Sequence, residues 1–314
     1  MDTQPYLLDL LDRGVNYDPH YLPSMNSDHL PMLLCAMAAL GADQAQLSAE
    51  RERYQQRLRP EVQGPTLAHW RDGIGRMECY APLRRHFSAE IERSSVDACL
   101  HAHLHEFFPS LAQTAFHGVI RLAYAIDFGS PAEVAAGLAY MAASCVDTPI
   151  TTTRINIAQV MRTQAAQPAQ EFSSERFGAR IRQLIEQDAY PEGCAASMAE
   201  CAAVALDVFR STRNFFALHM VTATQAARIC QTYLDEDIAT ASVSGALLAA
   251  HLAVGSPDFD PNNVLPVVSL DEEHDYKYGW SCLSEYRRYG DARYREEIAA
   301  LVEGRILPDW ITLF

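Results

Sequence analysis

Apolar residues recur at intervals of three and four in several long stretches of this chain. This spacing places apolar side chains on one face of an α-helix, whereas runs that alternate in the manner of a half-buried strand are nearly absent. We therefore predict an all-α fold with roughly ten or more helices. The clearest helical stretches are HLPMLLCAMAALGA (29–42), SAEIERSSVDACLHAHLHEFF (88–108), VIRLAYAI (119–126), PAEVAAGLAYMAASCV (131–146) and CAAVALDVFRSTRNFFALHMVTATQAARICQTYL (201–234).

Proline and glycine mark where these helices stop. The loops richest in proline, glycine and polar residues lie near positions 60, 170 and 260, and none is long enough to be a linker. We predict a single domain over residues 1–314 and leave open an internal seam near residues 165–175. The clearest interruptions are Gly41, Pro109, Gly129-Ser130-Pro131 and Ser256-Pro257.

The composition excludes several classes of partner. A formal net charge of -15 and a pI near 5.1 argue against nucleic acid or an anionic membrane as a partner. The chain starts without a basic segment ahead of an apolar one, and no stretch of about 18 apolar residues is present. We expect a cytoplasmic protein, whose eight scattered cysteines are reduced core residues. The sequence does not indicate an oligomeric state.

Lys277 is the only lysine among the 25 lysine and arginine residues, and it lies three residues after His274. Arginine keeps its proton near neutral pH, whereas a desolvated lysine can become a neutral amine. Such an amine can act as a base, form a Schiff base, or react with CO2 to give a carbamate. The alternative is that an arginine-rich composition has left one ordinary lysine on the surface.

Three histidines lie in the apolar helical stretches: His29, His117 and His219. A buried imidazole needs a partner, and a backbone carbonyl is the usual one for a histidine in a helix. If these three share one core with His274 and Lys277, a common metal ion would satisfy all of them. The pattern thus allows either separate core histidines or a buried, histidine-rich metal site between helices.

A second group of histidines, in the segment CLHAHLHEFF, gives a weaker indication. On a helix His101 and His105 share a face while His103 points elsewhere, so a pair but not all three could bind one metal. We expect a solvated or half-buried helix face. No role is predicted for the histidines at positions 20, 69, 86 and 251.

Several enzyme classes lack their motifs here. The one G-x-G, at residues 73–75, has no third glycine and no preceding strand, so no dinucleotide-binding fold and no tightly bound flavin are expected. A phosphate-binding P-loop, a G-x-S-x-G nucleophile turn and a zinc-type cysteine set are also missing.

Four stretches, in this order, resemble the questin oxidase-like family: DHLPMLLCAMAALGA with YQQRLRP after it, AFHGVIRLAYAI, FFALHMVTATQAARI, and EEHDYKYGWSCLSEYRRYGDARYREEIAAL. The resemblance covers most of the chain. It implies an all-α oxygenase of polyketide tailoring that acts on anthraquinone-type substrates by Baeyer–Villiger-like insertion or ring cleavage. It also implies a mononuclear iron held by histidines and a carboxylated lysine, here His29, His117, His219, His274 and Lys277.

The resemblance implies how such a site would work. Fe(II) with a carboxylated Lys277 would use O2 on an aromatic, phenolic or quinone-like small molecule, and the need for an external reductant such as NADPH is left open. Arg121, one turn after His117, is expected either to hold a substrate or ligand oxyanion or to form a structural ion pair. Met32 and Gln225 stand where members of the family carry further histidines, which would reshape the pocket.

Two other functions remain open from the sequence. The first is a zinc-type metallohydrolase, because histidines with a carboxylated lysine also suit the activation of water. The second is a metal-free helical binding or scaffold protein in which the histidines only pack.

Overall fold

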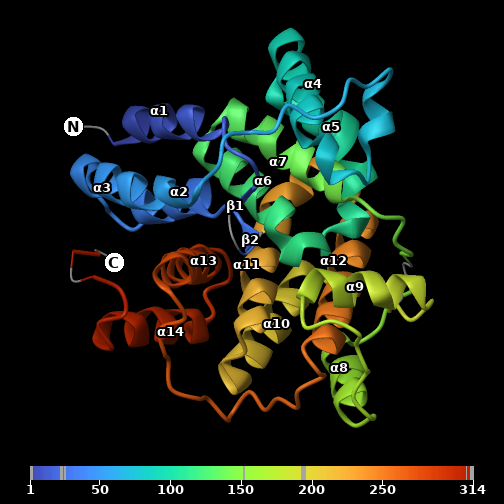
Figure 1. Cartoon of the computed structure of the whole chain (residues 1–314). Helices are drawn as coiled ribbons and strands as arrows, with labels where there is room; N and C mark the ends of the chain where they lie inside the picture. The colour runs from blue at the N-terminus through green and yellow to red at the C-terminus, as the bar shows by residue number, and fades with distance from the viewer. Residues whose placement is uncertain are drawn as a thin grey trace.

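Packed α-helices make up nearly all of the computed structural model (Figure 1), which describes residues 3–21, 24, 26–150, 153–191, 196–308 and 310–311. The prediction of an all-α fold is confirmed. The helices are α1 (Gln4–Gly14), α2 (Leu30–Ala39), α3 (Gln44–Tyr54), α4 (Tyr80–Arg93), α5 (Val96–Phe107), α6 (His117–Phe128), α7 (Pro131–Ser144), α8 (Ile157–Ala165), α9 (Phe177–Glu186), α10 (Met198–Thr212), α11 (Phe215–Cys230), α12 (Glu236–Ala253), α13 (Glu272–Tyr289) and α14 (Ala292–Glu303).

Short elements connect these helices. Strands β1 (His20–Tyr21) and β2 (Asn26–Ser27) pair antiparallel, with His20 opposite Ser27. The 3₁₀ turns are η1 (Gln55–Arg57), η2 (Trp70–Gly73), η3 (Met77–Cys79), η4 (Phe108–Ser110), η5 (Gln113–Phe116) and η6 (Gln231–Tyr233).

Two of the long helical stretches are each divided into two helices. Between α10 and α11, Arg213 adopts a left-handed conformation (φ 48°), and the Asn214 side chain then accepts hydrogen bonds from the N–H groups of Phe216 and Ala217. Between α4 and α5, the Ser95 side chain accepts from the Ala98 N–H. Both breaks occur because a polar side chain caps a new helix start, which favours ending the previous helix.

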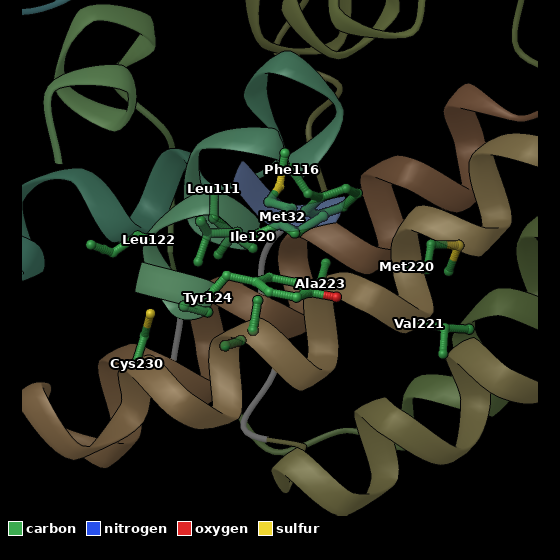
Figure 2. Close-up of a cluster of buried hydrophobic side chains, with 14 of the residues drawn as sticks. Met32, Leu111, Phe116, Ile120, Leu122, Tyr124, Met220, Val221, Ala223 and Cys230 are labelled. Carbon is green, nitrogen blue, oxygen red and sulfur yellow. The ribbon is translucent and has the colours of Figure 1, made fainter. Parts of the chain in front are cut away.

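The core lies where α6 packs against α7 and α11, and α13 packs against α2, α11 and α14. Figure 2 shows a part of it, in which Phe116, Ile120 and Tyr124 lie near Met32 of α2 and Ala223 of α11. Helices α6 and α7 approach closely at Gly137, where a Cβ atom would come within 2.7 Å of the Leu122 Cα. This close contact fixes α6, whose first residue is His117, against α7.

The segment near residues 165–175 connects α8 to α9, and both of these helices pack on α12. Buried apolar side chains form one cluster that includes residues from α1 through α14. Neither observation tests the predicted single domain or its seam, which stay predictions.

Two further expectations concern the whole chain. The seven cysteines within the described residues are free thiols, six of them buried, and Cys194 lies outside those residues. In the described part of the chain, no helix combines the length and the apolar character needed to cross a bilayer.

Candidate metal centre

Four histidines near the starts of α2, α6, α11 and α13 meet in the core, with the His29 and His117 rings stacked and the other neighbouring rings inclined to one another. His29 precedes the first residue of α2, His117 begins α6, His219 lies in the second turn of α11, and His274 lies in the first turn of α13. Their side chains form a closed ring, here called the four-histidine ring. The centroids are 4.6 Å apart for His29–His117, 5.0 Å for His117–His219, 5.1 Å for His219–His274 and 4.7 Å for His274–His29.

Three of these imidazoles are held in place through Nδ1. The Nδ1–H of His117 donates to the Thr114 carbonyl at 2.6 Å, and that of His219 donates to the Phe215 carbonyl at 3.1 Å. His274 Nδ1 lies 2.6 Å from the Asp271 carboxylate. When Nδ1 carries the proton, Nε2 keeps its lone pair, as in histidines that bind metals.

The Nε2 atoms of the ring are left without ordinary partners. Those of His219 and His274 are buried and have no hydrogen-bond partner in the described part of the chain. The Nε2 atoms of His29 and His117 lie only 2.7 Å from each other. Buried polar atoms are rarely left unsatisfied, so this arrangement suits a cation that accepts several lone pairs.

His29 is positioned differently from the other three. Its backbone N–H donates to the Tyr54 hydroxyl at 3.0 Å, and the neighbouring Asp28 carboxylate accepts from the first N–H of α2. Its Nδ1 lies 3.2 Å from a Glu273 oxygen, outside hydrogen-bond geometry. Glu273 in turn accepts from Arg57 at 3.1 Å, and burial raises the pKa of this carboxyl.

Electrostatics keep the ring neutral near pH 7. Burial lowers the pKa of all four imidazoles, and the nearby positive charge of Lys277 lowers each further. For His274 the pKa falls to about 4, although Asp271 opposes the change. Neutral imidazole is the form that binds metal ions.

Lys277 lies on α13 one helical turn after His274, and its charge acts on all four imidazoles of the ring. Its side chain is buried, with a relative exposure of 2%, so it is not an ordinary surface lysine. Burial lowers its pKa to about 8, against the opposing charges of Glu273 and Asp271. The described residues provide no hydrogen bond or ion pair to its amine at standard distances. At pH 7 about a tenth of such an amine is uncharged.

The backbone before His117 is strained. Thr114, Ala115 and Phe116 have φ values of 52°, 53° and 65°, in the left-handed region that non-glycine residues avoid. This turn places the Thr114 carbonyl against the His117 imidazole. Strain of this kind persists where the surrounding structure fixes it, and it is common at functional sites.

A cavity of about 470 Å³ opens over the ring, a volume suited to one small molecule. Aromatic side chains of β1, α9 and α11 contribute to its wall, and Asp271 and Glu273 line it beside the ring. Lys277 does not line it. The lining includes His29, His117, His219, His274, Asp271, Glu273, Tyr21, Phe177, Phe215, Phe216, Arg176 and Arg182.

Arg121 lies outside this cavity. Its guanidinium donates twice to Glu133, at 2.7 and 3.1 Å, and both side chains are buried. Glu133 holds the pKa of Arg121 above its usual value although burial alone would lower it. Of the two roles expected from the sequence, the geometry matches the structural ion pair and does not place this residue against a substrate.

The remaining sequence predictions concern the histidines of α5 and the residues around the ring. His101 and His105 are exposed on α5, as expected for a solvated face, whereas His103 is buried. Three neighbours of the ring were not predicted from the sequence: Asp271 and the Thr114 carbonyl, which accept from His274 and His117, and Glu273, which lies beside His29. Asp271 had a signal, because an aspartate three residues before His274 is a typical helix cap.

The family model described as Questin oxidase-like matches residues 26–289, which include all four histidines of the ring and Lys277. No curated protein matches the chain.

Proposed function

The chain belongs to the questin oxidase-like family, whose name indicates an oxidoreductase, and we propose that it is a non-haem iron-dependent oxygenase. Its substrates would be O2 and an aromatic, phenolic or quinone-like small molecule. The reaction would be a Baeyer–Villiger-like insertion of oxygen or a ring cleavage.

One observation supports the metal most directly. Ligand atoms of His29, His117 and His274 all lie within 4.8 Å of one another. The Nε2 atom of His219, whose ring packs beside those of His117 and His274, is buried and has no hydrogen-bond partner among the described residues. Imidazole nitrogen suits divalent iron, and also zinc, copper and nickel. We infer that His29, His117, His219 and His274 would hold the ion.

Lys277 would complete this set as a carbamate. Its neutral amine attacks CO2, a nitrogen–carbon bond forms, and the proton on nitrogen is released to water. The product is an anionic oxygen donor one helical turn from His274. Four neutral imidazoles do not compensate the charge of a divalent ion in the core. The carbamate anion would offset part of that charge.

The remaining residues would bind and shield the substrate. Phe177 and Phe216 stack with their rings 5.3 Å apart, and Phe215 contacts the His219 and His274 rings. A flat aromatic ring fits against such a wall, and apolar side chains exclude water from the reacting atoms. Bound Fe(II) would supply a spin-allowed reaction with O2 and stabilise developing negative charge.

The electron balance separates the two reactions. Insertion of one oxygen atom leaves the other to be reduced to water, which consumes two electrons from a reductant such as NADPH. Ring cleavage that incorporates both atoms consumes none. Oxygen uptake with and without NADPH, combined with mass analysis of the product from ¹⁸O2, distinguishes these cases.

The test of the proposed function uses iron-loaded protein and a panel of hydroxylated anthraquinones and simple phenols. We expect O2 uptake with at least one compound, lost in His219→Ala and retained in His101→Ala, which changes an exposed histidine on α5. Absence of uptake together with zinc-dependent hydrolysis of an ester or amide would replace the proposal with a metallohydrolase. A protein that binds no metal would be a binding or scaffold protein.

A further inference from the structure

A second group of metal-ligand side chains lies between α4 and α5. His86 and Glu90 are one turn apart on α4, and His103 faces them from α5. Figure 1 shows these two helices at the top of the view, and the group shares no residue with the ligand groups around His29, His117 and His274. The group is therefore separate from the four-histidine ring.

The distances within this group suit a small cation. His86 Nε2 lies 3.3 Å from one Glu90 oxygen, and His103 Nε2 donates a hydrogen bond to the other at 2.8 Å, a proton that a bound ion would replace. Two donor atoms of a tetrahedral zinc site with bonds of about 2.05 Å are about 3.3 Å apart. The Nε2 atom of His86 is buried and makes no hydrogen bond of acceptable geometry.

The surroundings fix the imidazoles yet leave a route for an ion. Trp70 stacks on His86 with ring centroids 4.8 Å apart and an interplanar angle of 13°, and it meets His103 edge-on at 5.2 Å. The side chains of His86 and Glu90 remain 25% and 21% exposed. Burial lowers the pKa of His86, which leaves its imidazole neutral and able to bind a metal near pH 7.

We propose that His86, Glu90 and His103 form a second metal site that binds a divalent cation of the zinc type. Two histidines and a glutamate are a known ligand set for zinc. The three ligands leave one coordination position toward solvent. Because they come from two helices, a bound ion links α4 to α5 across the Ser94–Ser95 turn.

This site is weaker than the four-histidine ring. To bind the ion through Nε2, His103 moves its proton to Nδ1, which is buried and has no hydrogen-bond partner in the described part of the chain. In the ring, by contrast, the Nδ1 atoms of His117, His219 and His274 each have an acceptor. A chelator is therefore expected to remove the ion between α4 and α5 first.

The test measures zinc bound per chain after the full-length protein is stripped, reloaded with zinc and desalted. His86→Phe keeps a ring to stack on Trp70 but removes the nitrogen, and Glu90→Gln keeps the size but removes the charge. Each is expected to bind one zinc fewer than the wild type. The control His105→Gln changes an exposed histidine of α5 and should match the wild type. Equal zinc in all four folded proteins would overturn the proposal.

A fluorescence measurement on the wild type keeps the test independent of how the variants fold. Ni²⁺, which quenches a nearby indole, is expected to quench Trp70, and Trp70→Phe should lose that part of the quenching. If Ni²⁺ leaves the Trp70 emission unchanged, the site does not bind divalent cations. Lys277→Ala should keep this quenching. Failure of the four-histidine ring to bind iron can therefore be distinguished from failure of the site at His86, Glu90 and His103 to bind a cation.

Discussion

The Nε2 atoms of His29 and His117 lie 2.7 Å apart, although 88 positions separate the two residues in the chain. His117 already donates through Nδ1 to the Thr114 carbonyl, so its Nε2 presents a lone pair. In the metal-free protein His29 must supply the proton for this contact. A metal ion would replace that proton and accept both lone pairs, which is the basis of the proposed centre.

Asp271 is expected to matter more for metal binding than for folding. It caps α13 and also accepts from His274 Nδ1. Asp271→Asn keeps a capping side chain but weakens the acceptor, so we expect metal affinity to fall by about 10–100-fold. Asp271→Ala should in addition lose about 1 kcal/mol of stability with the cap. Competition with a chelator and urea unfolding measure the two effects, and equal affinity in Asp271→Asn and the wild type would contradict this role.

The metal-free protein should lose stability as the pH falls from about 6.5. Burial lowers the pKa of each ring histidine, so the unfolded chain binds more protons than the folded one in this window. The contribution of His274 is fully present above pH 6.5 and is lost toward its folded pKa of about 4. Each histidine contributes a slope of up to about 1.4 kcal/mol per pH unit.

Urea unfolding at several pH values measures that slope. His274→Gln should reduce the slope of the free energy of unfolding against pH by the contribution of one histidine. His101→Gln, which changes an exposed residue, should leave that slope unchanged. A free energy of unfolding that is constant from pH 7 to 5 would show that these histidines are not buried in the neutral form.

The Arg121–Glu133 pair is expected to support the fold without touching the substrate. Arg121→Met leaves the buried Glu133 without a partner, which should cost about 3–5 kcal/mol. The double variant Arg121→Met with Glu133→Leu should recover most of that loss. Urea unfolding of the two single variants and the double variant checks this. If Arg121→Met is as stable as the wild type but loses substrate affinity, the residue acts in the cavity after all.

The left-handed turn before His117 should be relieved by glycine. Ala115 has a φ of 53°, which costs a non-glycine residue about 1–2 kcal/mol. Because glycine also gains freedom in the unfolded chain, Ala115→Gly is expected to stabilise the fold by about 1 kcal/mol or less. Ala115→Val should destabilise it. Thermal unfolding of both variants tests the turn, and a destabilised Ala115→Gly would argue against the left-handed conformation.

Helix positions could be predicted from the sequence because they rest on local pattern, whereas the grouping of the four histidines with Lys277 was implied by the family resemblance. The spacing of apolar residues around His219 and the single lysine at Lys277 are visible in the chain itself. The breaks at Arg213 and Ser94 were missed, since an apolar pattern continues across them and only the capping side chains signal a new helix.

The surroundings of the ring could not be predicted in the same way. The contact between Glu273 and His29 joins residues far apart in the chain and depends on how α2 packs on α13. The turn at Thr114 contains no glycine to signal it. His86 received no role from the sequence because its partner His103 lies on the next helix, and a one-turn spacing alone pairs it only with Glu90.

The most direct test of the proposed centre is the metal content of the purified protein, measured by elemental mass spectrometry beside Lys277→Ala and Lys277→Arg. Arginine keeps a positive charge and cannot form a carbamate. We expect near-stoichiometric iron in the wild type and little in either variant. Zinc in place of iron would favour a hydrolase. Full iron in Lys277→Arg, or no metal in the wild type after reconstitution, would contradict a centre built on the four histidines and a carboxylated lysine.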